Sequence, residues 1–349
     1  MNQSFSTLPS KHILVTGGAG FIGSNFIRHI VGASYEIVNY DKLTYAGNLE
    51  NLADVEEHFE FVHGDICDAE TLRRTMETHT IDTVVHFAAE SHVDRSILGP
   101  VLFTETNVVG THILLEVARA CNIKKFIHIS TDEVYGSLGD EGVFTESSPL
   151  NPTSPYAVSK TSSDLLVLSY CKTFGFPAVV LRCSNNYGPY QFPEKLIPLM
   201  IVNAMRGKKL PVYGDGKNVR DWIHTSDYSR AVVCAMEKGI TGEVYNVGSS
   251  NEWRNIDIVR LILRELGKGD DLIEFVKDRP AHDRRYAIDS SKIRSELGWT
   301  PQVEFAEGIK ETIEWYRAHQ SWWERVMSGE YIRYYEEQYK ERLSHIHIS

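Results

Sequence analysis

The chain has 349 residues, of which 42% are hydrophobic and 24% are charged, and its formal net charge at pH 7 is -11. This length suggests about two domains, and the apolar content suffices for a sizeable core. Proteins that bind duplex nucleic acid neutralise its phosphates with Lys and Arg, so the acidic balance argues against a nucleic-acid partner.

The cysteine pattern favours a reducing compartment. The five cysteines stand far apart, at Cys67, Cys121, Cys171, Cys183 and Cys234, with no C-x-x-C pair. We therefore expect reduced, buried thiols and a cytoplasmic protein. No run approaches the ~18 apolar residues of a membrane span, so we expect no membrane partner. No metal is expected, and His345 and His347 are interpreted as part of a tail.

The first half of the chain alternates short apolar runs with helix-like patterns. The expected strands are His12 to Thr16, Tyr35 to Tyr40, Phe59 to His63, Thr83 to Phe87 and Lys125 to Ser130. The expected helices are Ile22 to Val31, Ala69 to Thr78 and Val101 to Ala120. This alternation predicts an α/β fold with a doubly wound parallel sheet, whose ligands bind beyond the carboxyl ends of the strands. Residues 178–182 and 242–247 are expected to extend the sheet.

The second half is less regular and predicts a smaller α/β substrate-binding domain interleaved with the first. Residues 210–224, with a Gly-rich turn at 214–216, suggest a hairpin, and residues 256–266 and 305–319 suggest helices. The expected cofactor-binding domain covers 11–185 and about 224–250, and the substrate domain covers about 186–223 and 251–330, with tails at 1–10 and 331–349. Aromatic residues near the end are expected to serve packing: Trp315, Trp322, Trp323, Tyr331, Tyr334 and Tyr335.

A G-x-x-G-x-x-G run, Gly17 to Gly23, follows the first expected strand and opens the first expected helix. Such glycines allow a tight turn, and the amino end of the helix presents free N–H groups to a pyrophosphate. Asp41 lies 18 residues beyond Gly23, at the end of the second expected strand. A carboxylate there accepts ribose hydroxyls and repels a 2′-phosphate, which predicts a Rossmann domain that binds NAD rather than NADP.

Tyr156 and Lys160 stand four residues apart at the start of an expected helix, so both side chains share one face. A tyrosine is a poor base at neutral pH unless positive charge lowers its pKa of about 10. A neighbouring ammonium and an oxidised nicotinamide ring both do so. The pair, combined with the glycine run, resembles the extended short-chain dehydrogenase/reductase family, which includes sugar-nucleotide epimerases, decarboxylases and dehydratases.

Asp132 and Glu133, within Ser130 to Gly136, follow the fifth expected strand. Removal of water from a sugar needs a base for the C5 proton and an acid for the C6 hydroxyl. Two adjacent carboxyls serve if their environments push their pKa values apart. An ordinary solvated pair of acids in a loop is the alternative, which their place beside a strand end disfavours.

The combined motifs resemble the dTDP-glucose 4,6-dehydratase family from Lys11 to about Trp323. The resemblance rests on Thr131-Asp132-Glu133, Glu90-Ser91-His92-Val93-Asp94, Arg182 to Pro189, Glu194-Lys195-Leu196-Ile197-Pro198, Gly214 to Trp222 and His282 to Tyr286. It implies that Thr131 orients the sugar, Asp132 is the general acid and Glu133 the general base. It further implies that Tyr156 is the oxidising base and Lys160 its partner. Ala281 departs from the Gly usual there.

The resemblance also implies the binding residues. NAD is expected to contact Gly17, Gly20, Phe21, Ile22, Gly23, Asp41, Lys42, Leu43, Thr44, Asp65, Ile66, Phe87, Ala88, Ala89, Ser91, Thr106, Tyr156, Lys160 and Asn186. The nucleotide sugar is expected to contact Ser91, Thr131, Asn185, Lys195, Leu196, Pro211, Tyr213, Arg220, Asn255, Arg279 and His282. Lys195 and Arg220 suit a diphosphate, although a surface salt bridge accounts equally well for either alone.

The implied reaction oxidises C4 of dTDP-glucose, eliminates water across C5 and C6 and returns the hydride to C6, giving a 4-keto-6-deoxy sugar. Two alternatives stay open. One is an NAD-dependent nucleotide-sugar epimerase or decarboxylase, and the other is a catalytically idle dinucleotide-binding sensor, which the intact Tyr-Lys pair disfavours. The resemblance also implies a homodimer formed by the helices at 101–120 and 156–174.

Overall fold

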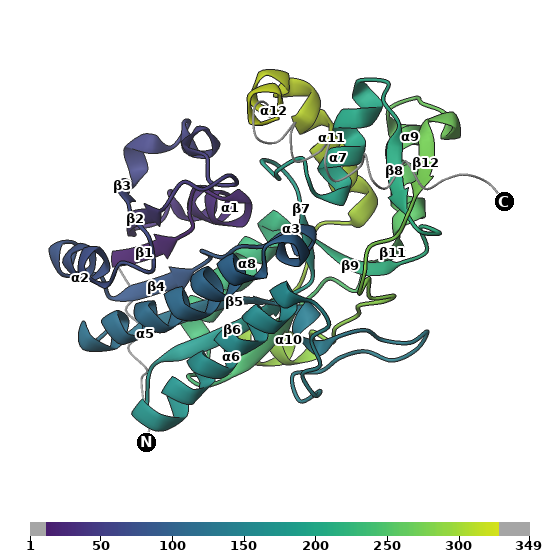
Figure 1. Cartoon of the computed structure of the whole chain (residues 1–349). Helices are drawn as coiled ribbons and strands as arrows, with labels where there is room; N and C mark the ends of the chain where they lie inside the picture. The colour runs from purple at the N-terminus through teal and green to yellow at the C-terminus, as the bar shows by residue number, and fades with distance from the viewer. Residues whose placement is uncertain (1–11, 328–349) are drawn as a thin grey trace.

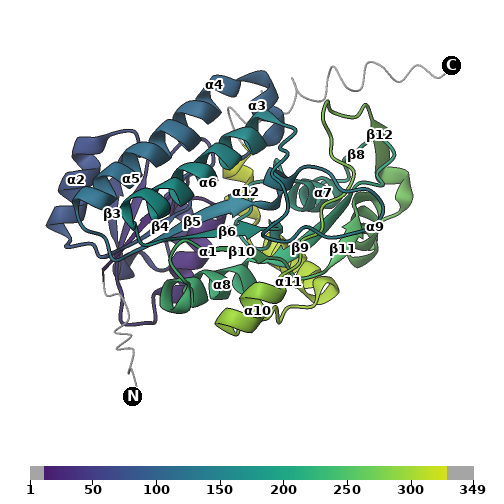
Figure 2. The same cartoon turned by 90° about the horizontal axis from the view of Figure 1, so that it is seen from below.

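A sheet of seven parallel strands organises the larger lobe, with helices on both faces (Figures 1 and 2). The computed structural model describes residues 12–327. The strand order is β10-β6-β5-β4-β1-β2-β3. The strands are β1 (His12–Thr16), β2 (Glu36–Asp41), β3 (Glu60–His63), β4 (Thr83–His86), β5 (Lys125–Thr131), β6 (Ala178–Cys183) and β10 (Val244–Val247). The predicted doubly wound parallel sheet is confirmed.

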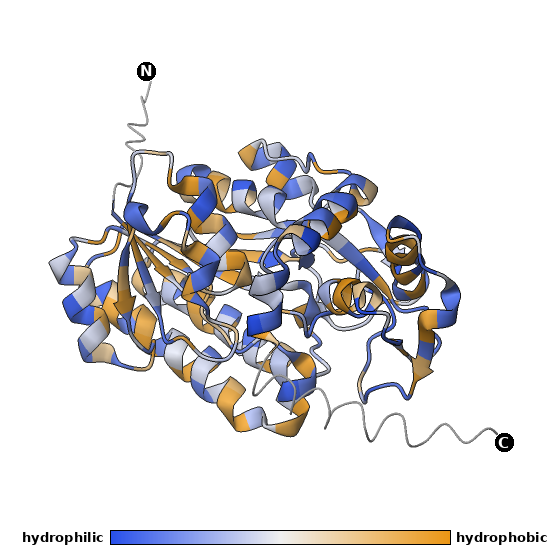
Figure 3. Ribbon diagram, turned by 90° about the horizontal axis from the view of Figure 1, so that it is seen from above, coloured by the Kyte–Doolittle hydropathy of each residue, from blue (hydrophilic) through white to orange (hydrophobic). Residues whose placement is uncertain are grey.

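Side chains of the central strands alternate between two apolar cores, because successive residues of a strand point to opposite faces. Ile13 and Val15 pack in the core under α1 (Phe21–Ile30) and α8 (Thr225–Lys238), whereas Leu14 packs in the core under the opposite helices. Those opposite helices are α2 (Ala69–Thr78), α5 (Thr111–Ala120) and α6 (Pro155–Phe174). Figure 3 shows these strands mostly in the hydrophobic colour. Both faces are therefore buried, as the near-continuous apolar runs predicted.

The strand ends lie level at one edge of the sheet. Thr16 pairs with Tyr40 on one side and with His86 on the other, so the chain leaves β1, β2 and β4 at the same height. The glycine run, Asp41 and Phe87 follow directly from these ends. This register brings distant parts of the sequence to one edge.

The helix expected over residues 101–120 is interrupted. After α3 (Val93–Leu98) come α4 (Pro100–Phe103), a π-helical segment η3 (Thr104–Gly110) and then α5. The sequence pattern predicted a helix here but did not distinguish a π-helical segment, with its i→i+5 hydrogen bonds, from a regular α-helix. The expectation of one regular α-helix over residues 101–120 is therefore wrong for Thr104–Gly110.

The smaller lobe combines two short sheets with helices. Its strands are β7 (Asn185–Tyr187), β8 (Leu210–Tyr213), β9 (Val219–His224), β11 (Glu252–Arg254) and β12 (Ile273–Val276). Its helices are α7 (Leu196–Met205), α9 (Asn255–Glu265), α11 (Phe305–Ala318) and α12 (Gln320–Val326), while α10 (Ser291–Leu297) contacts β10 of the large sheet. Short 3-10 helices are η1 (Leu49–Leu52), η2 (Glu56–His58), η4 (Asp132–Tyr135) and η5 (Asp270–Leu272).

The hairpin expected at residues 210–224 is wrong. β8 pairs with β12, whereas β9 pairs with β7 and β11, so the two strands belong to different sheets. The turn between them contains Gly214 and Gly216, both with positive φ, and it redirects the chain instead of folding it back. The turn residues were visible in the sequence, but the partners of each strand lie far along the chain.

The predicted boundaries of the two interleaved domains stay a prediction.

The aromatic residues that end the described chain pack as expected. Trp322 and Trp323 are buried in the core of the smaller lobe, and the Trp315 ring stacks on His319. Tyr331, Tyr334, Tyr335, His345 and His347 lie outside the described residues. Over residues 12–327, no helix is both long and apolar enough to cross a membrane.

Candidate active site

A cavity of about 430 Å³ lies at the carboxyl ends of the large sheet, against the smaller lobe. Its wall contains every predicted NAD contact except Leu43, and all five predicted catalytic residues. Four predicted sugar contacts also line it: Ser91, Thr131, Asn185 and Lys195. The remaining ones lie outside its wall: Leu196, Pro211, Tyr213, Arg220, Asn255, Arg279 and His282. The structure thus gathers residues between Gly17 and Lys195 around one space.

The glycine run forms one end of the cavity. Gly17 has a φ of 72°, and a Cβ there would lie 2.5 Å from the backbone nitrogen of Ala88, so a larger residue would displace the next strand end. Gly20 caps α1 without a side-chain hydrogen bond, which leaves N–H groups of the first turn directed at the cavity. This is the arrangement that binds a pyrophosphate.

Asp41 is held by the backbone at the end of β2. Its Oδ2 accepts the N–H of Ala19 at 2.9 Å and its Oδ1 accepts the N–H of Leu43 at 2.8 Å. Burial nevertheless raises the pKa of this carboxyl, and the two N–H donors oppose that rise. Each oxygen keeps a lone pair for a ligand hydroxyl. Leu43 therefore acts through its N–H on Asp41.

Other polar atoms in the wall have no partner among the described residues. Asn185 Oδ1, Asn186 Oδ1 and Gln191 Oε1 are buried and accept no hydrogen bond there. A buried polar atom without a partner is costly, so these acceptors suit a ligand that carries donors. Together with the glycine run and Asp41, they fit NAD.

Asp132 and Glu133 are placed by the end of β5. Thr131 ends this strand, and its hydroxyl accepts the N–H of Glu133 at 3.2 Å, which begins η4. Asp132 is only 2% exposed, and its Oδ2 has no hydrogen-bond partner among the described residues. Both acids line the cavity. A solvated pair of loop acids, the alternative from sequence, does not describe this geometry.

The two carboxyls have different electrostatic surroundings. Burial raises the pKa of Asp132 well above its usual value, and the charges of Glu133 and Asp221 raise it further. Burial also raises the pKa of Glu133, but the charges of Arg279, Arg220 and Lys195 lower it. The pKa of Asp132 is thus raised more strongly than that of Glu133, where three cations oppose the effect of burial.

Tyr156 and Lys160 occupy the first turns of α6. Ser154 begins the helix by accepting the N–H of Ala157 at 3.1 Å, and Pro155 stands at its first position. Burial raises the pKa of Tyr156 well above 10, and the charge of Glu133 raises it further, while the Thr131 hydroxyl lowers it. Burial lowers the pKa of Lys160 to about 8, and its Nζ donates to the carbonyl of Ile129 at 2.6 Å.

The π-helical segment η3 fixes the wall opposite the glycine run. Asn107 is buried and pairs with the backbone of Glu90 in both directions, at 2.8 and 3.0 Å. Its Nδ2 also donates to the hydroxyl of Ser159 at 2.8 Å. Thr106, the residue before it, lines the cavity. The turn therefore ties the end of β4 to the helix that carries Tyr156.

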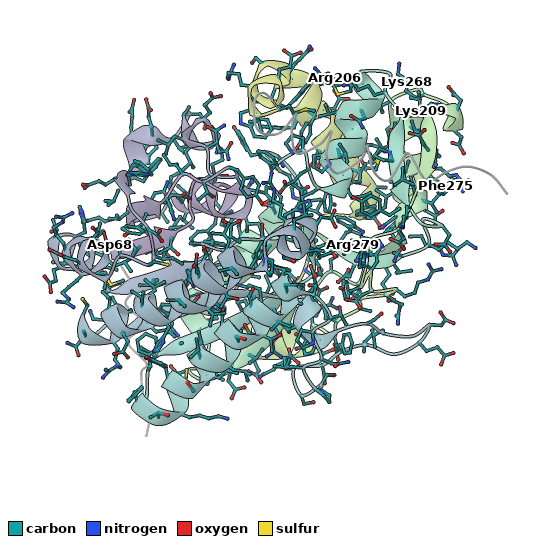
Figure 4. All side chains as sticks on the ribbon, in the orientation of Figure 1. Asp68, Arg206, Lys209, Lys268, Phe275 and Arg279 are labelled. Carbon is teal, nitrogen blue, oxygen red and sulfur yellow. The ribbon has the colours of Figure 1, made fainter. Side chains whose placement is uncertain are left out.

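A group of cations extends from the acids toward the smaller lobe. Figure 4 shows Arg279 where the two lobes meet, and its guanidinium lies 3.5 Å from Asp94 of α3. Tyr213 donates to the same carboxylate at 3.1 Å. Ala281 has a φ of 50°, in the left-handed region that favours glycine. Of the predicted sugar contacts outside the cavity wall, Arg220 and Arg279 lie close enough for their charges to act on Glu133.

Sequence reasoning missed several residues of the wall. Tyr45, Glu90, Gln191, Phe192 and Glu194 line the cavity but were not assigned. Glu90 and Glu194 belong to the motifs that carried the resemblance, so the assigned residues next to them in sequence were the signal that could have identified them as part of the site. Tyr45 follows the predicted contact Thr44, and no pattern marks it.

Residues 14–312 match the family described as GDP-mannose 4,6 dehydratase. The dTDP-glucose 4,6-dehydratase of Shigella flexneri is 52% identical, and the match covers 95% of this chain and 99% of that protein. A crystal structure of the dTDP-glucose 4,6-dehydratase of Streptomyces venezuelae, with NAD and a dTDP ligand bound, is 50% identical with a TM-score of 0.88, over 90% of this chain and 99% of that one.

The dTDP-glucose 4,6-dehydratase of Bacillus anthracis in complex with NAD is 48% identical with a TM-score of 0.86, over 91% of this chain and 100% of that one. Sequence identity, shared fold and matching length agree. The chain belongs to the NAD-dependent dTDP-glucose 4,6-dehydratase family.

Proposed function

We propose that this chain is an NAD-dependent lyase that converts dTDP-glucose to dTDP-4-keto-6-deoxyglucose. The observation that carries the proposal is the position of two adjacent carboxyls, Asp132 and Glu133, with different charged neighbours, in the wall of the cavity that contains the glycine run. Elimination of water requires an acid and a base together, whereas an epimerase or a decarboxylase does not require this pair. The relatives reported above support the same substrate.

The residues that would hold NAD are the glycine run, Asp41, Asn186 and Thr106, all in the cavity wall. Bound there, NAD would supply the acceptor for a hydride from C4 of the sugar and the donor of the same hydride to C6, so the reaction would have no net redox change. The residues of the chain must supply every proton transfer.

Tyr156 takes the proton of the C4 hydroxyl. Its raised pKa makes the phenol neutral unless positive charge lies near its oxygen, and we assign that role to Lys160, one helical turn further along α6. Thr131, whose hydroxyl lowers the pKa of Tyr156, is assigned the role of orienting the sugar. Oxidation at C4 then acidifies the hydrogen at C5.

Glu133 removes the C5 proton as a carboxylate, and Asp132 gives a proton to the departing C6 hydroxyl. These assignments follow from the direction of the charges: three cations favour the ionised form of Glu133, while its negative charge favours the protonated form of Asp132. The cations Lys195, Arg220 and Arg279 are proposed to bind the diphosphate as well.

Mass spectrometry of the products from dTDP-glucose, UDP-glucose and UDP-glucuronic acid tests this function. We expect loss of one water from dTDP-glucose, with a 4-keto product that a carbonyl reagent traps. An isomer of unchanged mass without a keto group would show an epimerase instead, and loss of carbon dioxide from a uronic acid substrate would show a decarboxylase.

We also propose that two copies pair through the helices at 101–120 and 156–174. These helices lie side by side on one face of the large sheet (Figures 1 and 2). They expose apolar side chains that a monomer would leave in water: Val101, Val109, Val158, Leu165 and Phe174. Val158 and Leu165 are seven residues apart and therefore share one helix face.

Leu165→Glu is expected to shift the protein from dimer to monomer, because it would place a charge within the proposed apolar interface. Light scattering coupled to size-exclusion chromatography measures the mass directly. Ile240→Glu, which alters an apolar side chain of similar exposure (52% against 55%) in the loop between α8 and β10, is the matched control. A monomeric wild type, or a dimer that survives Leu165→Glu, would contradict this surface.

We further infer that the enzyme works in the cytoplasm. All five cysteines are unpaired in the structure, but only Cys183 among them is buried, so the expectation of buried thiols is wrong for the other four. Unpaired thiols persist in reducing compartments, which supports this location.

A further inference from the structure

Tyr45, Arg95 and Glu194 come from three separate segments and meet at the cavity wall. Tyr45 lies in the loop after β2, Arg95 on α3, and Glu194 just before α7. The Tyr45 hydroxyl donates to Glu194 Oε1 at 3.1 Å, and Arg95 Nε donates to Glu194 Oε2 at 3.2 Å. The Arg95 guanidinium lies 3.8 Å from the centre of the Tyr45 ring. Each residue thus contacts the other two.

Burial makes these contacts interdependent. The Glu194 side chain is only 2% exposed, and a carboxylate removed from water requires charged or hydrogen-bonding partners. Tyr45 and Arg95 supply one partner to each oxygen. The Phe192 ring packs edge-on against Tyr45 at 5.6 Å. The charge of Lys195 also favours the ionised form of Glu194. Loss of Tyr45 or Arg95 would still remove one of the hydrogen bonds of this buried carboxylate, so the three side chains act as a unit.

The unit joins the two sides of the cavity. The loop that carries Tyr45 is attached to the glycine run, because Asn48 N–H donates to the carbonyl of Ala19 at 3.0 Å. Glu194 belongs to the segment that leads into α7 of the smaller lobe. Tyr45 and Glu194 both line the cavity. Their hydrogen bond therefore connects the glycine run to the opposite lobe across the space that fits NAD.

We infer that Tyr45, Arg95 and Glu194 form a latch that retains NAD between the two halves of the reaction. The inference rests on the proposed function, in which the hydride taken from C4 must return to the same sugar at C6. Loss of the cofactor between these steps would leave a 4-keto sugar that cannot be completed. The three side chains are positioning residues, since they hold the wall and take no part in proton transfer.

The latch predicts faster loss of NAD from two variants, measured without substrate. Tyr45→Phe removes one hydrogen bond to a carboxylate and keeps the ring, and Glu194→Gln removes the charge and keeps the shape. Each is expected to release NAD about tenfold faster during dialysis of the purified holoenzyme, since a charge-assisted hydrogen bond contributes about that factor. The double variant is expected to lose NAD no faster than about the worse single variant, because the residues act as one unit.

Tyr190→Phe is the matched control. Arg28 lies 4.2 Å from the centre of the Tyr190 ring and donates to its hydroxyl at 2.9 Å, so a second Arg–Tyr contact joins the lobes outside the cavity wall. This variant is expected to retain NAD like the wild type. If all three variants lost NAD equally fast, the effect would be general loosening of the lobes and the latch would be rejected.

A second readout follows the hydride. With dTDP-glucose deuterated at C4 and excess unlabelled reduced cofactor in solution, the wild type is expected to transfer the deuterium to C6 of its product. Tyr45→Phe is expected to lose a measurable fraction of that label. Unchanged NAD release in both Tyr45→Phe and Glu194→Gln overturns the latch, and if Glu194→Gln fails to fold, Tyr45→Phe alone decides. Failure of the proposed function would appear separately, as no 4-keto product from wild type.

Discussion

Glu133→Gln is expected to reduce bound NAD in the presence of dTDP-glucose while forming product about 10³-fold more slowly than the wild type. An amide of the same size cannot accept the C5 proton, and general-base catalysis commonly contributes about this factor. Oxidation at C4 depends on Tyr156 and should persist. The near-ultraviolet absorbance of reduced nicotinamide would therefore rise and stay high, while mass spectrometry would detect little dehydrated sugar.

Glu243→Gln is the control for that variant. Glu243 pairs with Lys292 at 2.6 Å at the edge of the large sheet, and it does not line the cavity. Its loss is expected to leave turnover unchanged. Normal product formation by Glu133→Gln would show that another group removes the C5 proton, and the role assigned to Glu133 would then be wrong.

Tyr156→Phe is expected to stop the reaction before any cofactor is reduced, with a loss of about 10³-fold or more in turnover. The change removes one hydroxyl, so the ring should still pack against Phe103, whose centre lies 6.3 Å away. Without the phenol, no group takes the C4 hydroxyl proton. The nicotinamide absorbance should stay flat after dTDP-glucose is added, in contrast to the rise expected for Glu133→Gln.

Two control experiments accompany the prediction for Tyr156→Phe. Tyr35→Phe, at an exposed contact with Glu237 away from the cavity, is expected to behave as the wild type. Bound NAD in Tyr156→Phe, measured after denaturation, should equal that in wild type, so that a flat absorbance reports chemistry and not an empty site. Reduction at the normal rate would assign the base to another residue.

The larger lobe could be predicted because its signals are local. Each strand is a short apolar run, and the glycine run, Asp41 and the pair Tyr156 and Lys160 sit at recognisable places in these repeats. A parallel sheet then brings all strand ends to one edge, so the convergence of distant residues follows from the fold class. The unequal pKa values of Asp132 and Glu133 could only be expected in general terms, since they depend on Arg220 and Arg279.

The parts that escaped prediction depend on contacts between distant residues. Tyr45 and Glu194 are 149 positions apart, and neither carries a pattern that points to the other. The pairing of β8 with β12 likewise joins residues 210–213 to residues 273–276. Prediction from the sequence favours pairing with the next strand along the chain, as in a hairpin. Ala281 adopts a conformation that its residue type disfavours, which a sequence cannot reveal without the surrounding contacts.

The large sheet is completed late in the chain, and this affects how the protein can be made. Its outer strand β10 pairs with β6, and α8 covers one face of the sheet together with α1, yet both follow the first three strands of the smaller lobe in sequence. A nascent chain that has left the ribosome only as far as residue 224 would expose the edge of β6 and the apolar side chains that α8 buries. Expression of residues 1–185 alone, as a free-standing nucleotide binder, should therefore yield aggregates. During synthesis of the whole chain, the first half should complete its folding only after α8 and β10 have been made.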